Sequence, residues 1–154
     1  MRRRSDGGFS LIEVVIALGL LAGVLITISG LFIIGDRQVK SGRTSSEALS
    51  VARTILEEMN RWGFRQTYQT FDSTYDGTVQ SYSIDSRTNA FAAKWQATLD
   101  EKLVNSRATI EIQSLGPASV PPNLNVTRAM RVLVTVFWDE GQRHRSVRVG
   151  TVRM

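Results

Sequence analysis

The residue types that most often carry out catalysis are sparse in this sequence of 154 residues. It contains no cysteine, which excludes a thiol nucleophile, a disulfide framework and a cysteine-ligated metal site. The only histidine, His144, lies between Arg143 and Arg145, and we interpret it as an exposed, solvated side chain. No candidate nucleophile or general base is therefore placed beside a partner, and we expect neither a catalytic residue nor an enzyme.

Two acidic pairs provide oxygen atoms of the kind that calcium prefers, namely Asp72 with Asp76 and Asp139 with Glu140. Neither pair has the spacing of a recognised calcium-binding loop. We therefore expect no metal site and no cofactor.

Arginine residues gather towards the C-terminus, and such a cluster can bind phosphate backbones. The candidate nucleic-acid patch comprises Arg131, Arg143, Arg145 and Arg153. These residues fall on polar positions of alternating segments, and no aromatic platform for single strands is interleaved with certainty. We favour a solvated strand face, so nucleic acid is not an expected partner.

The most unusual acidic residue is Glu13, the only ionisable side chain in the apolar run 9–34. A carboxylate at the centre of a membrane span costs about 2.5–3.5 kcal/mol, and less near an end. Such a residue calls for a partner. The alternative is that Glu13 reaches the lipid headgroups beside the N-terminus.

Residues 14–34 provide about 20 uncharged, mostly apolar residues, enough for a helix across the roughly 30 Å hydrocarbon core of a bilayer. Arg2, Arg3 and Arg4 precede the run, which predicts a cytoplasmic N-terminus and a domain outside the cytoplasm. A cleaved secretory signal needs a shorter apolar region. A plain signal anchor explains the arginines and the span but leaves Glu13 unexplained.

The residues Gly8-Phe9-Ser10-Leu11-Ile12-Glu13-Val14 resemble the class III signal of type IV prepilins and type II secretion pseudopilins. The resemblance implies that a membrane peptidase cuts after Gly8, on the cytoplasmic side, and methylates the amine of Phe9. It also assigns Glu13 to subunit registration, in which the carboxylate pairs with the Phe9 amine of a neighbouring subunit.

This family implies a minor pilin or pseudopilin, a structural subunit that helps to assemble or prime a type IV pilus or a related filament. Its expected partners are the prepilin peptidase, other pilins or pseudopilins, an inner-membrane assembly platform and the lipid bilayer. The expected location is the inner membrane, with a single pass, and then a surface or periplasmic filament. The alternative is a signal-anchored extracytoplasmic binding module, such as one that binds DNA during uptake.

After the apolar run the helical pattern continues, so we predict one helix over residues 9–62 with soft points at Gly35 and Gly42. Its apolar face recurs in steps of four and three at Ala48, Ala52, Ile55, Met59 and Trp62, flanked by Leu49 and Leu56. Charged residues, including Glu58, occupy the opposite face, which is typical of a helix that covers a sheet. Gly63 is the expected end.

The remaining sequence predicts a loop over 64–76 and strands over 77–85, 107–115, 129–138 and 143–152. Four-residue spacing of Phe91, Trp95, Leu99 and Leu103 predicts a short amphipathic helix, and residues 139–142 join the last two strands as a hairpin.

These elements predict an α+β type IV pilin fold, a long N-terminal transmembrane helix packed on an antiparallel sheet of about four strands. The predicted segments are a cleaved leader (1–8), a transmembrane half of the helix (9–34), an amphipathic half (35–63) and an α+β globular head (64–154). The final hairpin, with its valine-rich strand ending in tryptophan, resembles PilV-like minor pilins.

Overall fold

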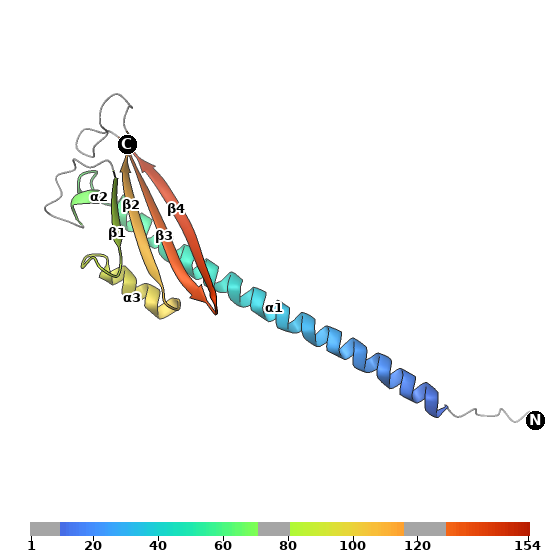
Figure 1. The fold of residues 1–154 in the computed structure, drawn as a ribbon. Helices are drawn as coiled ribbons and strands as arrows, with labels where there is room; N and C mark the ends of the chain where they lie inside the picture. Colours follow the sequence, from blue (N-terminus) through green and yellow to red (C-terminus); the bar gives the residue numbers. More distant parts are fainter. Residues whose placement is uncertain (1–9, 71–80, 116–128) are drawn as a thin grey trace, which may run out of the picture. The chain divides into compact units, whose positions relative to one another are not determined.

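The computed structural model describes residues 10–70, 81–115 and 129–154, apart from the side chain of Tyr68. The elements are α1 (Leu11–Asn60), α2 (Gln66–Gln69), β1 (Ser81–Asp85), α3 (Ala93–Lys102), β2 (Arg107–Ser114), β3 (Met130–Glu140) and β4 (Arg143–Arg153) (Figure 1). They fall into two compact units that divide between Lys40 and Ser41. Each unit is described by itself below.

The second unit is built on a four-stranded sheet in the order β1-β2-β3-β4, and every neighbouring pair is antiparallel. Alternate residues share a face because successive side chains in a strand point to opposite sides. On one face the central strands bury a continuous apolar set: Ala108, Ile110, Ile112, Met130, Val132, Val134, Val136 and Trp138. The alternation read from the sequence is thereby confirmed for β2 and β3.

Residues 41–60 of α1 cover this apolar face of the sheet (Figure 1). Their buried side chains are Ala48, Val51, Ala52, Ile55, Leu56 and Met59, a helical stripe that includes most of the predicted apolar face. Trp95 and Leu99 of α3 join the same core. The α+β fold class, with a long N-terminal helix packed on a four-stranded antiparallel sheet, is confirmed.

Three details differ from the prediction. The helix ends at Asn60, and Trp62 lies in the turn that follows while still packing on the core. The predicted loop 64–76 contains α2, whereas α1 is continuous through Gly35 and Gly42 as one helix was predicted to be. The last hairpin has a turn of only two residues, because β3 and β4 pair up to Glu140 and Arg143. Gly141 occupies this turn with a φ of 62°, a left-handed conformation that glycine adopts without steric cost.

Candidate functional site in the apolar helix and the basic strand

Of the three residues assigned to filament chemistry, Gly8 and Phe9 lie outside the described residues. Glu13 lies in the first turn of α1 and is exposed. The positive end of the helix dipole favours a carboxylate there. No ion pair involves Glu13 among the residues that the structure describes, so a cationic partner would have to come from elsewhere.

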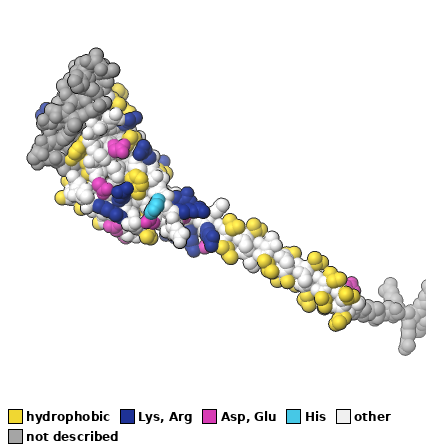
Figure 2. Space-filling view, in the orientation of Figure 1, with side chains coloured by type: hydrophobic (Ala, Val, Ile, Leu, Met, Phe, Trp, Pro, Cys, Tyr) yellow, Lys and Arg dark blue, Asp and Glu magenta, His cyan; other side chains and the backbone are white. Residues whose placement is uncertain are grey.

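The first unit exposes an apolar surface along the helix. Leu11 is 85% exposed and Phe32 is 74% exposed, and Figure 2 shows hydrophobic side chains along this segment. By length and composition α1 can cross a membrane, and none of its most apolar stretch is buried. A water-soluble helix would hide such a stripe in a core, so the segment is suited to an apolar environment.

Two hydroxyl side chains within this apolar segment, those of Thr27 and Ser29, are satisfied by the helix itself. The Thr27 hydroxyl donates to the Gly23 carbonyl at 2.9 Å, and the Ser29 hydroxyl donates to the Leu25 carbonyl at 2.8 Å. Such bonds remove the cost of an unpaired hydroxyl in a medium without water. Gly19 and Gly23 leave open space beside the helix, where a neighbouring helix could approach closely.

The four arginines of the candidate nucleic-acid patch do not share one face of the sheet. The register pairs Arg131 with Val152, whereas Arg153 pairs with the buried Met130. Arg143, Arg145 and Arg153 therefore lie on the face that carries the core, and Arg131 lies on the opposite face. Arg131 bonds Gln113 there. These arginines are close together in the sequence, but successive side chains of a strand point to opposite sides, so the sheet places them on two faces.

Arg153 has a structural partner that the sequence did not indicate. Its guanidinium donates to the carbonyl oxygen of Met59 at 3.0 Å, to that of Trp62 at 2.5 Å, and to the Thr67 hydroxyl. Helix α1 has no basic residue in its own last turn. Arg153 therefore satisfies carbonyls at and just beyond the C-terminus of α1 and places a positive charge at the negative end of its dipole.

The two carboxylates at the hairpin, those of Asp139 and Glu140, lie on opposite faces of the sheet and contact different partners. Asp139 contacts His144 at 2.5 Å and accepts a hydrogen bond from Asn105 at 2.7 Å. Two hydrogen bonds lower the pKa of Asp139 below its ordinary value, and the one from Asn105 has a larger effect than the one with His144. Glu140, on the other face, accepts from Ser41 and pairs with Arg145, each at 3.1 Å. Asp72 and Asp76 lie outside the described residues.

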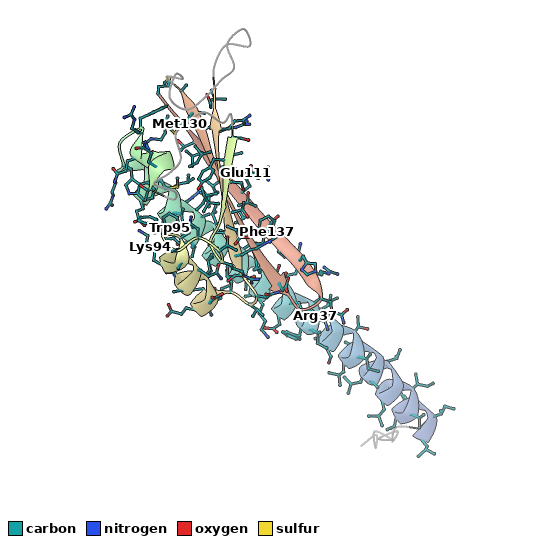
Figure 3. All side chains as sticks on the ribbon, turned by 60° about the vertical axis from the view of Figure 1, so that its left-hand side comes forward. Arg37, Lys94, Trp95, Glu111, Met130 and Phe137 are labelled. Carbon is teal, nitrogen blue, oxygen red and sulfur yellow. The ribbon has the colours of Figure 1, made fainter. Side chains whose placement is uncertain are left out.

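A contact between α1 and α3 was also missed by the sequence reasoning. Glu58 is half-buried rather than on a fully solvated face, and it pairs with Lys94 and accepts the Trp95 indole N–H at 2.8 Å. Lys94 and Trp95 lie next to each other on α3 (Figure 3). Burial by itself raises the pKa of Glu58, but the hydrogen bonds from Lys94 and Trp95 outweigh it, and the pKa lies below its ordinary value. The four-residue spacing identified Trp95 as a core residue but gave no sign of this partner.

A helix with an exposed apolar segment, continued by a segment that packs on a four-stranded antiparallel sheet, defines a pilin-like architecture. Comparisons with protein-family models, with curated proteins and with solved structures find no match for this chain.

Proposed function

We propose that this chain is a subunit of a type IV pilus or a related filament, of the minor pilin or pseudopilin kind. One observation carries the proposal. The single helix α1 exposes apolar side chains in its first part, with Glu13 in its first turn, and contributes core residues to a small antiparallel domain in its second part. The sequence around Gly8 and Phe9 adds the expected peptidase signal.

The proposed location follows from the physical chemistry of α1. The apolar segment lies in the bilayer of the inner membrane, the arginine-rich N-terminus stays in the cytoplasm, and residues 41–154 lie outside it. Prepilin peptidase removes residues 1–8 and methylates the amine of Phe9. The mature chain then leaves the lipid bilayer for the filament through an assembly platform, where its partners are other pilins or pseudopilins.

Glu13 has the proposed role of setting the register between subunits. An α-amine has an ordinary pKa near 7.7–8.0, so the Phe9 amine of a neighbouring subunit carries positive charge at neutral pH, and methylation preserves it. Pairing removes an uncompensated charge from an apolar surrounding. Desolvation of both groups reduces the net stabilisation, so the main effect of the pair is a defined axial stagger between helices.

The second candidate function is a signal-anchored binding module that keeps its leader and acts outside the cytoplasm as a monomer. The apolar helix fits this function equally well. DNA binding by such a module is less favoured, because the candidate arginines lie on two faces and Arg153 is engaged at the end of α1.

Leader processing separates the two candidates. The chain is expressed in cells with and without an active prepilin peptidase, and the intact mass and N-terminal residue of the membrane-extracted protein are determined. We expect loss of residues 1–8 and a methylated Phe9 only when the peptidase is present. In Gly8→Val a bulky side chain at the cut should block processing while membrane insertion continues.

Gly7→Val is the matched control, since it adds the same side chain one position earlier and should still be processed. Recovery of an intact Met1 start from the native chain beside an active peptidase would refute the filament proposal and favour the signal anchor.

A further inference from the structure

Strand β4 forms one edge of the sheet. It is the last strand in the order β1-β2-β3-β4, it is 11 residues long, and β3 is its only strand partner in the described part of the chain. In a two-residue hairpin the pair that flanks the turn is hydrogen bonded, so Arg143 and every second residue after it bond to β3. The residues between them direct their backbone N–H and C=O groups outward: His144, Ser146, Arg148, Gly150 and Val152.

These outward backbone groups make no hydrogen bond with other backbone groups among the residues that the structure describes. An open row of donors and acceptors is a template for one more strand. The opposite edge is formed by β1, which has only five residues. The longer template is therefore on β4.

The charge along this edge is positive on both faces of the sheet. Strand β4 contains four arginines and a histidine and no acidic residue. The side chain of Arg143 has no hydrogen-bond or ion-pair partner in the described part of the chain, and that of Arg148 bonds only the uncharged Thr135 hydroxyl, at 3.0 Å. Arg143 and Arg148 lie on opposite faces because they are five residues apart. On each face of the sheet, a strand added to this edge would lie beside a guanidinium that no acidic side chain neutralises.

We propose that the outer edge of β4 binds an extended, acidic segment of a partner protein by strand addition. Backbone hydrogen bonds supply affinity in this mode, and side chains on the two faces supply specificity. A second copy of β4 is disfavoured as the occupant, since two arginine-rich strands side by side repel each other. The same arginines discourage indiscriminate edge pairing, so they select the partner as well as attract it. The inference does not depend on entry into a filament.

The test uses the full-length protein in neutral detergent micelles and a synthetic peptide of nine residues in which glutamate alternates with threonine and valine. Binding is measured by calorimetry and compared with a peptide in which lysine replaces each glutamate. We expect the glutamate peptide to bind at least about tenfold more tightly, and its affinity to fall as salt is added. Hydrogen exchange should slow at the amides of residues 144, 146, 148, 150 and 152 and stay unchanged at 145, 147 and 149.

Two variants separate the backbone from the charge. Ser146→Pro removes one outward N–H without removing a bond to β3, so it should abolish peptide binding, while Ser146→Ala should bind normally. The double variant with Arg143→Glu and Arg148→Glu keeps the backbone edge and should prefer the lysine peptide. Trp fluorescence melting checks that each variant is folded.

Several outcomes would overturn the proposal. These are no binding of the glutamate peptide, equal binding of both peptides, normal binding by a folded Ser146→Pro, or unchanged selectivity in the double variant. Concentration-dependent self-association that Ser146→Pro abolishes would replace the acidic partner with a second copy.

Discussion

At the scale of single residues, Arg153 connects the last strand to the end of the first helix. It bonds the Trp62 carbonyl across 91 positions in the sequence. The carbonyls at a helix C-terminus have no partners within the helix, and here a guanidinium from β4 reaches them. A residue that was a candidate for phosphate binding is therefore used to hold the head together.

Replacing Arg153 with alanine should destabilise the second compact unit by about 1–3 kcal/mol, because it removes charge-assisted hydrogen bonds to two carbonyls and a hydroxyl, together with the positive charge at the negative end of the α1 dipole. The measurement is chemical unfolding of the full chain in micelles, followed by tryptophan fluorescence. All three tryptophans lie in the second compact unit, residues 41–154, so the signal reports on this unit.

Arg148→Ala is the matched control for Arg153→Ala. It removes another arginine of β4, whose side chain makes its only hydrogen bond within the described residues to a hydroxyl, so we expect a change within about 0.5 kcal/mol. Equal effects of the two substitutions would contradict the capping role of Arg153.

At the scale of elements, two glycines show that a helix and a hairpin turn require different backbone conformations. Gly42 lies inside α1, and an added Cβ there would meet nothing within 4 Å. Gly141 is the first residue of the two-residue turn between β3 and β4 and has a positive φ. An added Cβ there would also meet nothing within 4 Å. The space around the two residues is the same, so only backbone conformation distinguishes them.

Gly42→Ala should therefore stabilise the second compact unit by about 0.5–1 kcal/mol, because alanine loses less backbone entropy than glycine on forming a helix. Gly141→Ala should destabilise it by about 1–2 kcal/mol, because a Cβ is strained at positive φ. Both values come from the same unfolding measurement in micelles. A shift of the same sign in the two variants would show that the turn conformation does not control the hairpin.

At the scale of the whole molecule, α1 is one continuous helix whose two parts have different surroundings. Residues of its first part are exposed and apolar, and residues of its second part complete the core of the sheet. The proposed function requires the first part to leave the bilayer for a filament, and in that proposal Glu13 is the residue that distinguishes these two states.

Glu13→Val should leave cleavage and membrane insertion intact, because an apolar residue partitions more readily into the bilayer. Entry into the filament should fall by about tenfold, which corresponds to the loss of about 1.4 kcal/mol of interaction. The measured quantity is the ratio of protein in sheared filaments, or co-isolated with other pilins, to protein in the inner-membrane fraction.

Thr27→Val is the control for Glu13→Val, since it also removes a polar side chain from the apolar segment but one that bonds only its own helix. An unchanged ratio for Glu13→Val would refute the registration role and leave Glu13 as a tolerated residue near the membrane surface.

The sequence by itself determined the elements and the faces that they bury. Helical spacing identified Ala48, Ala52 and Ile55, and strict alternation identified the buried residues of β2 and β3, because periods of 3.6 and 2 are local properties of the backbone. The apolar run that contains Glu13 can likewise be recognised from neighbouring residues alone. The proposal of a filament function therefore rests on the sequence far more than on tertiary contacts.

Only the tertiary structure decided where the charged side chains go. It divided the arginines of the last strands between two faces, brought Arg153 to the end of α1, and placed Glu58 between Lys94 and Trp95. The physical reason is that a charged side chain satisfies its hydrogen bonds with whatever partner the packed fold brings near it. Those partners lie 36 to 94 positions away in the sequence, where no local period can reveal them.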